Sequence, residues 1–245
     1  MGNDSMKRQE QVLAIIVNCY VETAEPVGSR YVSRKLGLSS ATIRNVMADL
    51  EDLGLIAQPH TSAGRIPTDK GYRYYIDSLM RLKRVNDTVI SQIRDEYHEA
   101  IRSLEDVMER TSHIIASLTN YVGVTLFPAY DRLCLDGASH IIEQPEFRDI
   151  KKLYTIMKFL ERKKELLELM HSDLSDEKLK IHIGKEMKQG YLSECSVVTR
   201  GYKVKGKVSG RIGVIGPKRM GYERVIPMVE FLADTVSEIM DKVDV

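Results

Sequence analysis

The sequence has few cysteines and no long apolar run. Its 245 residues include three cysteines, Cys19, Cys134 and Cys195, and no two of them form a CxxC pair. This spacing argues against a zinc site and against a disulfide framework. We expect neither a metal nor a cofactor. No apolar run approaches the roughly 18 residues that a membrane span needs, and the polar N-terminus lacks the apolar stretch of a signal peptide. We therefore expect a cytoplasmic protein with no membrane partner.

The sequence also lacks a strong net charge. The formal net charge of +1 excludes a uniformly basic protein that coats nucleic acid. The charge is nevertheless uneven, because residues 28–48 contain no acidic residue but four basic ones: Arg30, Arg34, Lys35 and Arg44. Such a run is compatible with a solvated surface or with binding to phosphate groups.

Motifs of catalysis are missing as well. The glycines at positions 210, 213 and 216 match neither the dinucleotide-binding pattern nor the Walker pattern. Cys134, Asp136 and His140 fall within one short strand and turn, whereas the members of a catalytic triad are brought together by tertiary structure. We therefore expect that the protein is not an enzyme.

Three short helices are predicted near the N-terminus, over residues 6–22, from Ser29, and over residues 40–53. Ser39 is placed to cap the third helix, and its apolar positions recur at helical spacing. Its opposite face carries a cation and an amide between two alanines: Ala41, Arg44, Asn45 and Ala48. Alanines allow close approach to a DNA major groove, arginine can pair with guanine, and asparagine can pair with adenine. The pattern predicts a helix-turn-helix.

A hairpin-like segment follows the third helix. Two short extended pieces, residues 55–58 and 65–67, flank a polar tip from His60 to Gly64. The position after a candidate recognition helix favours a wing, although an ordinary surface hairpin has the same pattern. Residues 68–80 then form a helix rich in tyrosine, which suits packing better than a stacking platform for single strands.

A heptad pattern extends over residues 87–118 and predicts one long helix. Its apolar positions form a seam that suits self-association in a coiled coil. The same stripe suits packing against the protein's own C-terminal domain, and the two interpretations are compatible. The predicted dimer interface consists of Ile90, Ile93, Tyr97, Leu104 and Val107.

The pattern changes after residue 120. Strands are predicted over residues 121–127, 132–136, 180–184, 196–199 and 207–215, and helices over 149–170 and 222–243. This mixture indicates an α+β fold with a largely antiparallel sheet. We expect three parts: a winged helix-turn-helix over residues 1–80, a connecting and dimerising helix over 81–120, and a regulatory domain over 121–245.

Several motifs together resemble one family, that of the heat-inducible transcription repressor HrcA. They lie along nearly the whole chain, at residues 7–13, 25–30, 39–51, 59–68, 144–147, 195–199 and 213–220. The resemblance implies a winged helix-turn-helix joined to a GAF-like α+β domain. It implies repression of chaperone genes by a homodimer that binds an inverted-repeat DNA operator, and a chaperonin that keeps the repressor active.

The chain departs from the family pattern after Phe127 and Pro128. Family members continue through more sheet and an inserted dimerising domain, whereas here residues 132–137 follow almost at once. We therefore expect a reduced GAF-like domain, with the 87–118 helix taking over part of the dimer contact. An alternative function is a winged-helix regulator whose GAF-like domain senses a small molecule.

The predicted DNA-binding residues combine the third helix, the basic run and the wing. Those on or before the third helix are expected to contact bases and phosphates, and those of the wing are expected to flank the groove. They are Arg30, Lys35, Ser40, Thr42, Arg44, Asn45, His60, Thr61, Ser62 and Arg65.

Overall fold

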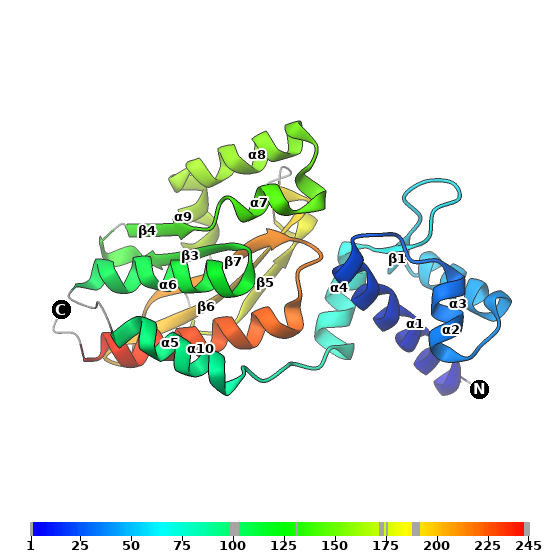
Figure 1. The fold of residues 1–245 in the computed structure, drawn as a ribbon, viewed down its shortest axis with the longest axis horizontal. Helices are drawn as coiled ribbons and strands as arrows, with labels where there is room; N and C mark the ends of the chain where they lie inside the picture. Colours follow the sequence, from blue (N-terminus) through cyan, green and yellow to red (C-terminus); the bar gives the residue numbers. More distant parts are fainter. Residues whose placement is uncertain are drawn as a thin grey trace. The chain divides into compact units, whose positions relative to one another are not determined.

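The computed structural model describes residues 2–98, 103–130, 132–171, 174, 176–187 and 192–242. Its contacts divide the chain into two compact units (Figure 1). The first unit comprises Met1–Arg81 with Lys218–Gly221, and the second comprises Leu82–Pro217 with Tyr222–Val245. The predicted boundary near residue 80 is therefore close to the observed one, but residues 81–120 do not form a separate part.

The first unit is a winged helix-turn-helix. Helices α1 (Gly2–Thr23), α2 (Ser29–Leu36) and α3 (Ser40–Asp52) precede a small two-stranded sheet of β1 (Ile56–Ala57) and β2 (Ile66–Pro67). The two strands pair antiparallel, with Ile56 opposite Pro67. Helix α4 (Asp69–Tyr74) follows and continues as a π-helical turn, Tyr75–Leu79. The winged-helix prediction is confirmed.

Local signals set the ends of these helices. The Ser39 hydroxyl accepts a hydrogen bond of 3.0 Å from the backbone N–H of Thr42, which satisfies one free donor at the start of α3. Gly37 ends α2 in the left-handed region, with φ of 67°. One prediction is corrected here: Gly28, not Ser29, occupies the N-cap position of α2, and no side chain caps that helix.

The core of the first unit combines the apolar faces of α1 and α3. Fully or almost fully buried side chains include Val12, Leu13, Ile16, Ile43 and Leu50. Two tyrosines also belong to this interior, because Tyr72 of α4 and Tyr75 of the π-helical turn are buried. The Tyr75 hydroxyl donates to Asn18 Oδ1 over 2.7 Å. These two tyrosines therefore pack inside the unit, as the spacing favoured, and offer no stacking platform.

A short segment from far along the chain completes the first unit. Lys218 Nζ lies 2.9 Å from Asp69 Oδ1, at the start of α4. Arg219 donates to the carbonyl oxygen of Val21 in α1, and Met220 is fully buried. In sequence, this segment lies between the last strand and the last helix of the second unit.

The second unit is built on a five-stranded antiparallel sheet with the order β4-β3-β7-β6-β5. All neighbouring pairs are antiparallel, which confirms an α+β fold. The strands are β3 (Val122–Phe127), β4 (Arg132–Asp136), β5 (Lys180–Ile183), β6 (Cys195–Val204) and β7 (Lys207–Pro217).

Helices cover both faces of this sheet (Figure 1). On one face, α6 (Leu104–Thr119) contacts β3, β4 and β7, and α10 (Tyr222–Met240) contacts β6 and β7. Gly123 allows α6 to approach β3 closely, because a Cβ there would lie 2.1 Å from the Ser112 carbonyl oxygen. The other face packs against α7 (His140–Glu143), α8 (Ile150–Glu161) and α9 (Lys163–His171) through an apolar core.

The prediction of a single long helix over residues 87–118 is wrong. The structure has two helices, α5 (Asp87–His98) and α6, and the chain turns back between them (Figure 1). The Tyr97 and Thr111 hydroxyl oxygens lie 2.7 Å apart, whereas 14 residues of continuous helix would separate their Cα atoms by about 21 Å. The helix predicted over 149–170 is likewise divided, into α8 and α9, at Arg162.

The predicted dimer seam is buried within the chain itself. Ile93, Tyr97 and Val107 are at most 5% exposed, and Ile90 is half-buried. The side chain of Leu104 lies outside the described residues. An apolar residue already covered by its own unit is not available to a second copy, so the prediction that this seam forms the dimer interface is corrected. The heptad spacing identified a buried face but not what covers it.

Candidate nucleic-acid interface

Helix α3 presents a polar face to solvent beside its buried face. Ile43, Val46, Met47 and Leu50 point into the unit, which fixes the rotation of the helix. That rotation leaves Arg44 and Asn45 exposed, and Ala41 and Ala48 are exposed as well. The face therefore combines a guanidinium and an amide with two small residues, an arrangement that suits base edges in a major groove.

Cationic side chains from three elements surround one hollow. It has a volume of about 510 Å³, and its lining includes Arg30 at the start of α2, Arg44 of α3, and Ser62 and Arg65 of the wing. Gly28 and Ser29 also line it. They lie at the N-terminal end of α2, where no side chain caps the backbone. Among the described residues that line this hollow none is acidic. Guanidinium groups and free backbone N–H groups suit the phosphate groups of a nucleic acid.

The wing is a closed loop with an exposed tip. Gln58 Nε2 donates to the Ala63 carbonyl oxygen over 3.0 Å, and the Ala63 N–H donates to the His60 carbonyl oxygen. Ser62 has a positive φ of 77°, which turns the chain at the tip. His60, Thr61 and Ser62 are exposed, so these three predicted residues are accessible to a partner.

The base of the wing is fixed to the segment before α2. Arg65 and Val27 exchange two backbone hydrogen bonds of 2.9 Å. Gly64 makes this approach possible, because a Cβ at this position would lie 2.5 Å from the carbonyl carbon of Val27. The Arg65 side chain is half-buried and paired with Glu51 of α3, at 2.9 Å between Nη2 and Oε2. Sequence analysis predicted that Arg65 contacts DNA and did not identify Glu51.

The remaining predicted residues differ in accessibility. Lys35 is exposed, and its Nζ lies 5.8 Å from the centre of the Tyr31 ring. Ser40 and Thr42 are half-buried, and the Thr42 hydroxyl lies 2.8 Å from the capping hydroxyl of Ser39. The structure thus brings Arg30, Arg44, Ser62 and Arg65 to one hollow. Gly28 and Ser29 are additions that sequence analysis missed, because it assigned Ser29 to capping.

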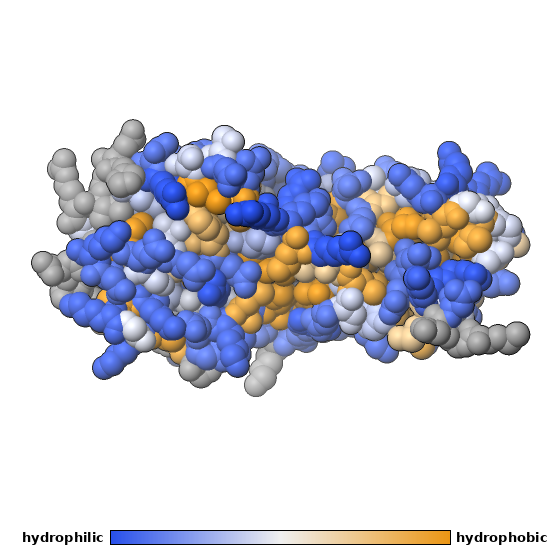
Figure 2. Space-filling view, turned by 90° about the horizontal axis from the view of Figure 1, so that it is seen from below, coloured by the Kyte–Doolittle hydropathy of each residue, from blue (hydrophilic) through white to orange (hydrophobic). Residues whose placement is uncertain are grey.

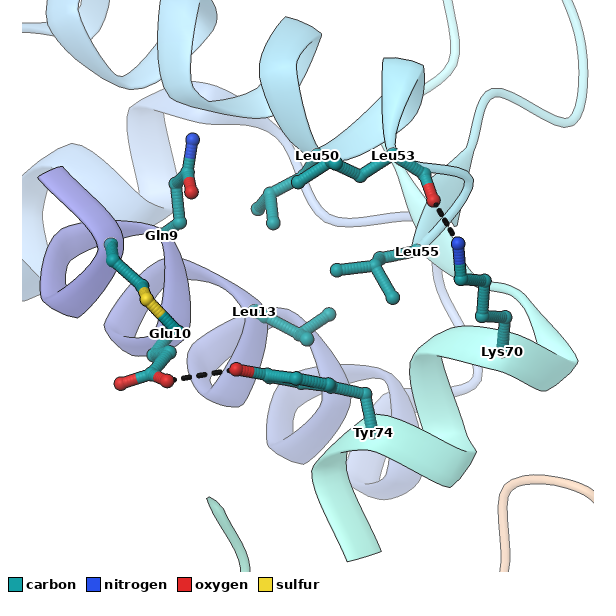
Figure 3. A pocket seen from close by; sticks show the side chains of 9 residues that line it. Gln9, Glu10, Leu13, Leu50, Leu53, Leu55, Lys70 and Tyr74 are labelled. Carbon is teal, nitrogen blue, oxygen red and sulfur yellow. Dashed lines mark hydrogen bonds between the residues drawn. The ribbon is translucent and has the colours of Figure 1, made fainter. Parts of the chain in front are cut away.

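A second hollow of the first unit is apolar and lies beside the C-terminal end of α3. Its lining combines leucines of α1, α3 and the segment after α3 with other side chains, among them Gln9 and Lys70, and its volume is about 320 Å³ (Figure 3). Lys70 Nζ donates to the Leu53 carbonyl oxygen over 2.8 Å, which places a cation at the C-terminal end of α3. Tyr74 donates to Glu10 over 2.8 Å, and this hydrogen bond raises the pKa of Tyr74.

Membrane-spanning helices and metal-binding clusters are both absent from the described part of the chain. No described helix is both long and apolar enough to span a bilayer. The described residues hold no group of three or more histidine, cysteine, aspartate or glutamate side chains that could bind a metal ion. Hydrophilic residues cover much of the face drawn in Figure 2, and hydrophobic residues gather there in several patches. Exposed large apolar side chains include Met6, Leu53, Ile150 and Tyr154.

Comparison with known proteins decides the family. Residues 5–78 match the model of the HrcA winged helix-turn-helix DNA-binding domain, and residues 129–226 match that of the HrcA C-terminal domain. The heat-inducible transcription repressor HrcA of Pelotomaculum thermopropionicum is 31% identical, over 96% of this chain and 97% of the relative. The chain belongs to the HrcA family. HrcA of Geobacter sulfurreducens is 30% identical, over 97% of this chain and 99% of the relative.

Two further comparisons concern length and fold. The alignment with the Pelotomaculum HrcA extends over 337 residues, whereas this chain has 245. The Pelotomaculum protein therefore contains segments that have no counterpart in this chain. This agrees with the predicted loss of an internal part of the HrcA pattern. The crystal structure of a hypothetical protein has the same fold, with a TM-score of 0.72 and 20% identity, over 96% of this chain and 98% of that one.

Proposed function

We propose that this HrcA family member is a homodimeric repressor of chaperone genes that binds an inverted-repeat operator, and that a chaperonin modulates its activity. The observation that carries the proposal is the exposed face of α3, where Arg44 and Asn45 stand beside the cationic hollow. In this proposal α3 enters the major groove, and Arg44 and Asn45 contact base edges. Arg30, Lys35 and the start of α2 bind phosphate groups, and the tip of the wing flanks the groove.

The proposed inverted-repeat operator requires two copies of the chain. One chain carries one α3 helix, and an inverted repeat offers two equivalent half-sites. Two copies related by a two-fold axis therefore match such an operator. The seam of α5 and α6 is buried, so the proposed contact between copies lies elsewhere on the surface.

Selection of bound sites from random DNA duplexes tests the proposal. We expect a palindromic consensus, and we expect Arg44→Ala to relax the preference at one position of each half-site. A good bidentate base contact contributes about 1–3 kcal/mol of discrimination. Arg148→Ala removes the same charge from an exposed position of the second unit and serves as the control. Full operator preference in the Arg44→Ala protein would contradict the assignment of α3 to the groove.

The modulation by a chaperonin needs a separate test. The resemblance to the HrcA family, which implies a chaperonin that keeps the repressor active, supports this part of the proposal. Purified chaperonin is expected to increase the fraction of repressor that binds operator, and an excess of unfolded protein is expected to reverse that increase. Operator binding that is unaffected by chaperonin would contradict this part of the proposal and leave DNA recognition intact.

The alternative function, detection of a small molecule by the second unit, gains no support from the core. The face of the sheet beneath α7, α8 and α9 is packed with apolar side chains, among them Val124, Phe159 and Val197. A thermal-shift screen with a metabolite panel distinguishes this alternative, because a specific ligand would raise the melting temperature.

A further inference from the structure

Arg65 stands at the base of the wing with its guanidinium already engaged. Its Nε and Nη2 atoms lie 3.0 Å and 2.9 Å from the same oxygen, Oε2 of Glu51. The Arg65 side chain is 23% exposed and that of Glu51 is 37% exposed. Two N–H groups that converge on one carboxylate oxygen hold the arginine in a fixed orientation, which a lysine ammonium does not reproduce.

The backbone of Arg65 is held as firmly as its side chain. Its N–H and carbonyl oxygen both bond to Val27, and Gly64 beside it is in close contact with the same segment. Glu51 lies in the last turn of α3. Arg65 therefore joins three parts of the unit: the segment that leads into α2, the base of the wing, and the end of the recognition helix.

We infer that Arg65 is a positioning residue, which together with Glu51 fixes the wing relative to α3. The pair aligns the wing tip with Arg44, so that both reach the same stretch of DNA. The inference rests on the proposed function, because it assumes that this face binds DNA. It revises the role that the sequence suggested for Arg65, that of a wing residue in direct contact with DNA.

The two roles predict opposite effects for the loss of Glu51. A direct DNA contact by Arg65 would be strengthened when the carboxylate is neutralised, because the guanidinium is released and a negative charge near the phosphates disappears. A positioning pair is weakened by the loss of either partner. Loss of both partners then adds little to the loss of one, because only one interaction is removed.

The experiment compares Glu51→Gln, Arg65→Gln and the double variant in the full chain. Operator affinity is measured for each at several salt concentrations, and thermal denaturation confirms that each protein is folded. We expect each single variant to bind about tenfold more weakly, and the double variant no more weakly than the weaker single. The slope of affinity against salt is expected to stay unchanged, because the number of phosphate contacts is unchanged.

Three further variants sharpen the result. Glu105→Gln breaks an exposed glutamate–arginine pair of the second unit, with Arg132 at 2.6 Å, and is expected to leave affinity unchanged. Lys35→Gln, proposed to remove a phosphate contact, is expected to reduce the salt slope by about one. Arg65→Lys is expected to restore only part of the affinity that Arg65→Gln loses. Lysine keeps the positive charge but lacks the two N–H groups that converge on Glu51.

The inference is overturned if Glu51→Gln binds operator as tightly as the unmodified protein or more tightly. It is equally overturned if Arg65→Gln flattens the salt dependence as Lys35→Gln does, because Arg65 would then contact phosphate. Failure of the proposed function is a distinct result, in which the unmodified protein shows no preference for any duplex.

Discussion

Tyr97 of α5 and Thr111 of α6 share a buried hydrogen bond of 2.7 Å between their hydroxyl oxygens. The Thr111 hydroxyl also donates to the Val107 carbonyl oxygen over 2.6 Å, so the phenol of Tyr97 is the donor to Thr111. The two residues are 14 positions apart in the sequence. The bond therefore holds α5 against α6 inside the second unit.

Removal of the acceptor, Thr111, is expected to reduce the free energy of unfolding more than removal of the donor, Tyr97. Thr111→Val leaves the buried Tyr97 hydroxyl without its partner and should reduce the free energy of unfolding by about 1–3 kcal/mol. The double variant with Tyr97→Phe should lose less, because no polar group remains unpaired. Urea titrations followed by far-UV circular dichroism measure both values. A Thr111→Val protein as stable as the unmodified one would contradict the hydrogen bond.

Buried tyrosines also make the stability sensitive to alkaline pH. Burial raises the pKa of Tyr97 and of Tyr202 above their ordinary value of 10.0. Above about pH 10 the unfolded chain loses these protons while the folded chain keeps them, so the unfolded state gains stability as pH rises. Below that pH both states hold the protons, and the groups contribute no pH dependence.

We therefore expect the free energy of unfolding to fall above about pH 10. The slope contributed by each buried tyrosine is at most about 1.4 kcal/mol per pH unit. Tyr97→Phe should reduce that slope, because it removes one of these buried phenols. Urea titrations at a series of alkaline pH values measure the slope. Equal slopes in the Tyr97→Phe and unmodified proteins would refute the assignment.

Sequence reasoning succeeded where the deciding signal is local. Ser39 and Gly54 mark the two ends of α3, and the structure places the first at the N-cap and the second in the left-handed region just beyond the helix. The spacing of the apolar residues then determines which face is buried, and so which face carries Arg44 and Asn45. The fold class and the winged helix follow from such signals, because caps and periodicity act over a few residues.

Sequence reasoning failed where the deciding contact is distant. The heptad pattern of residues 87–118 marks an apolar stripe, but only the tertiary fold shows that α5 turns back along α6. Arg65 is a cation beside a wing in the sequence, and its partner Glu51 lies 14 residues earlier. Neither the packing of α5 against α6 nor the pairing of Arg65 with Glu51 leaves a signal in the neighbouring sequence. Both contacts are therefore visible only in the structure.

Gly64 provides a test of the wing base that does not alter any charge. Its missing side chain leaves room for Val27, whose carbonyl carbon and oxygen would lie 2.5 Å and 2.6 Å from an added Cβ. Both contacts are backbone atoms, which cannot rotate away as the end of a flexible side chain can. Gly64→Ala must therefore push the wing away from the segment before α2 and strain the two hydrogen bonds between Arg65 and Val27.

We expect Gly64→Ala to lower the stability of the first unit by about 1–3 kcal/mol, the usual cost of overpacking. Operator affinity is expected to fall as well, because the wing tip and α3 lose their alignment. Thermal denaturation and a titration with operator duplex measure the two effects. Gly221→Ala is the matched control, since nothing lies within 4 Å of a Cβ at that position. If both alanine variants bound operator as the unmodified protein does, the wing base would not set the geometry of the DNA-binding face.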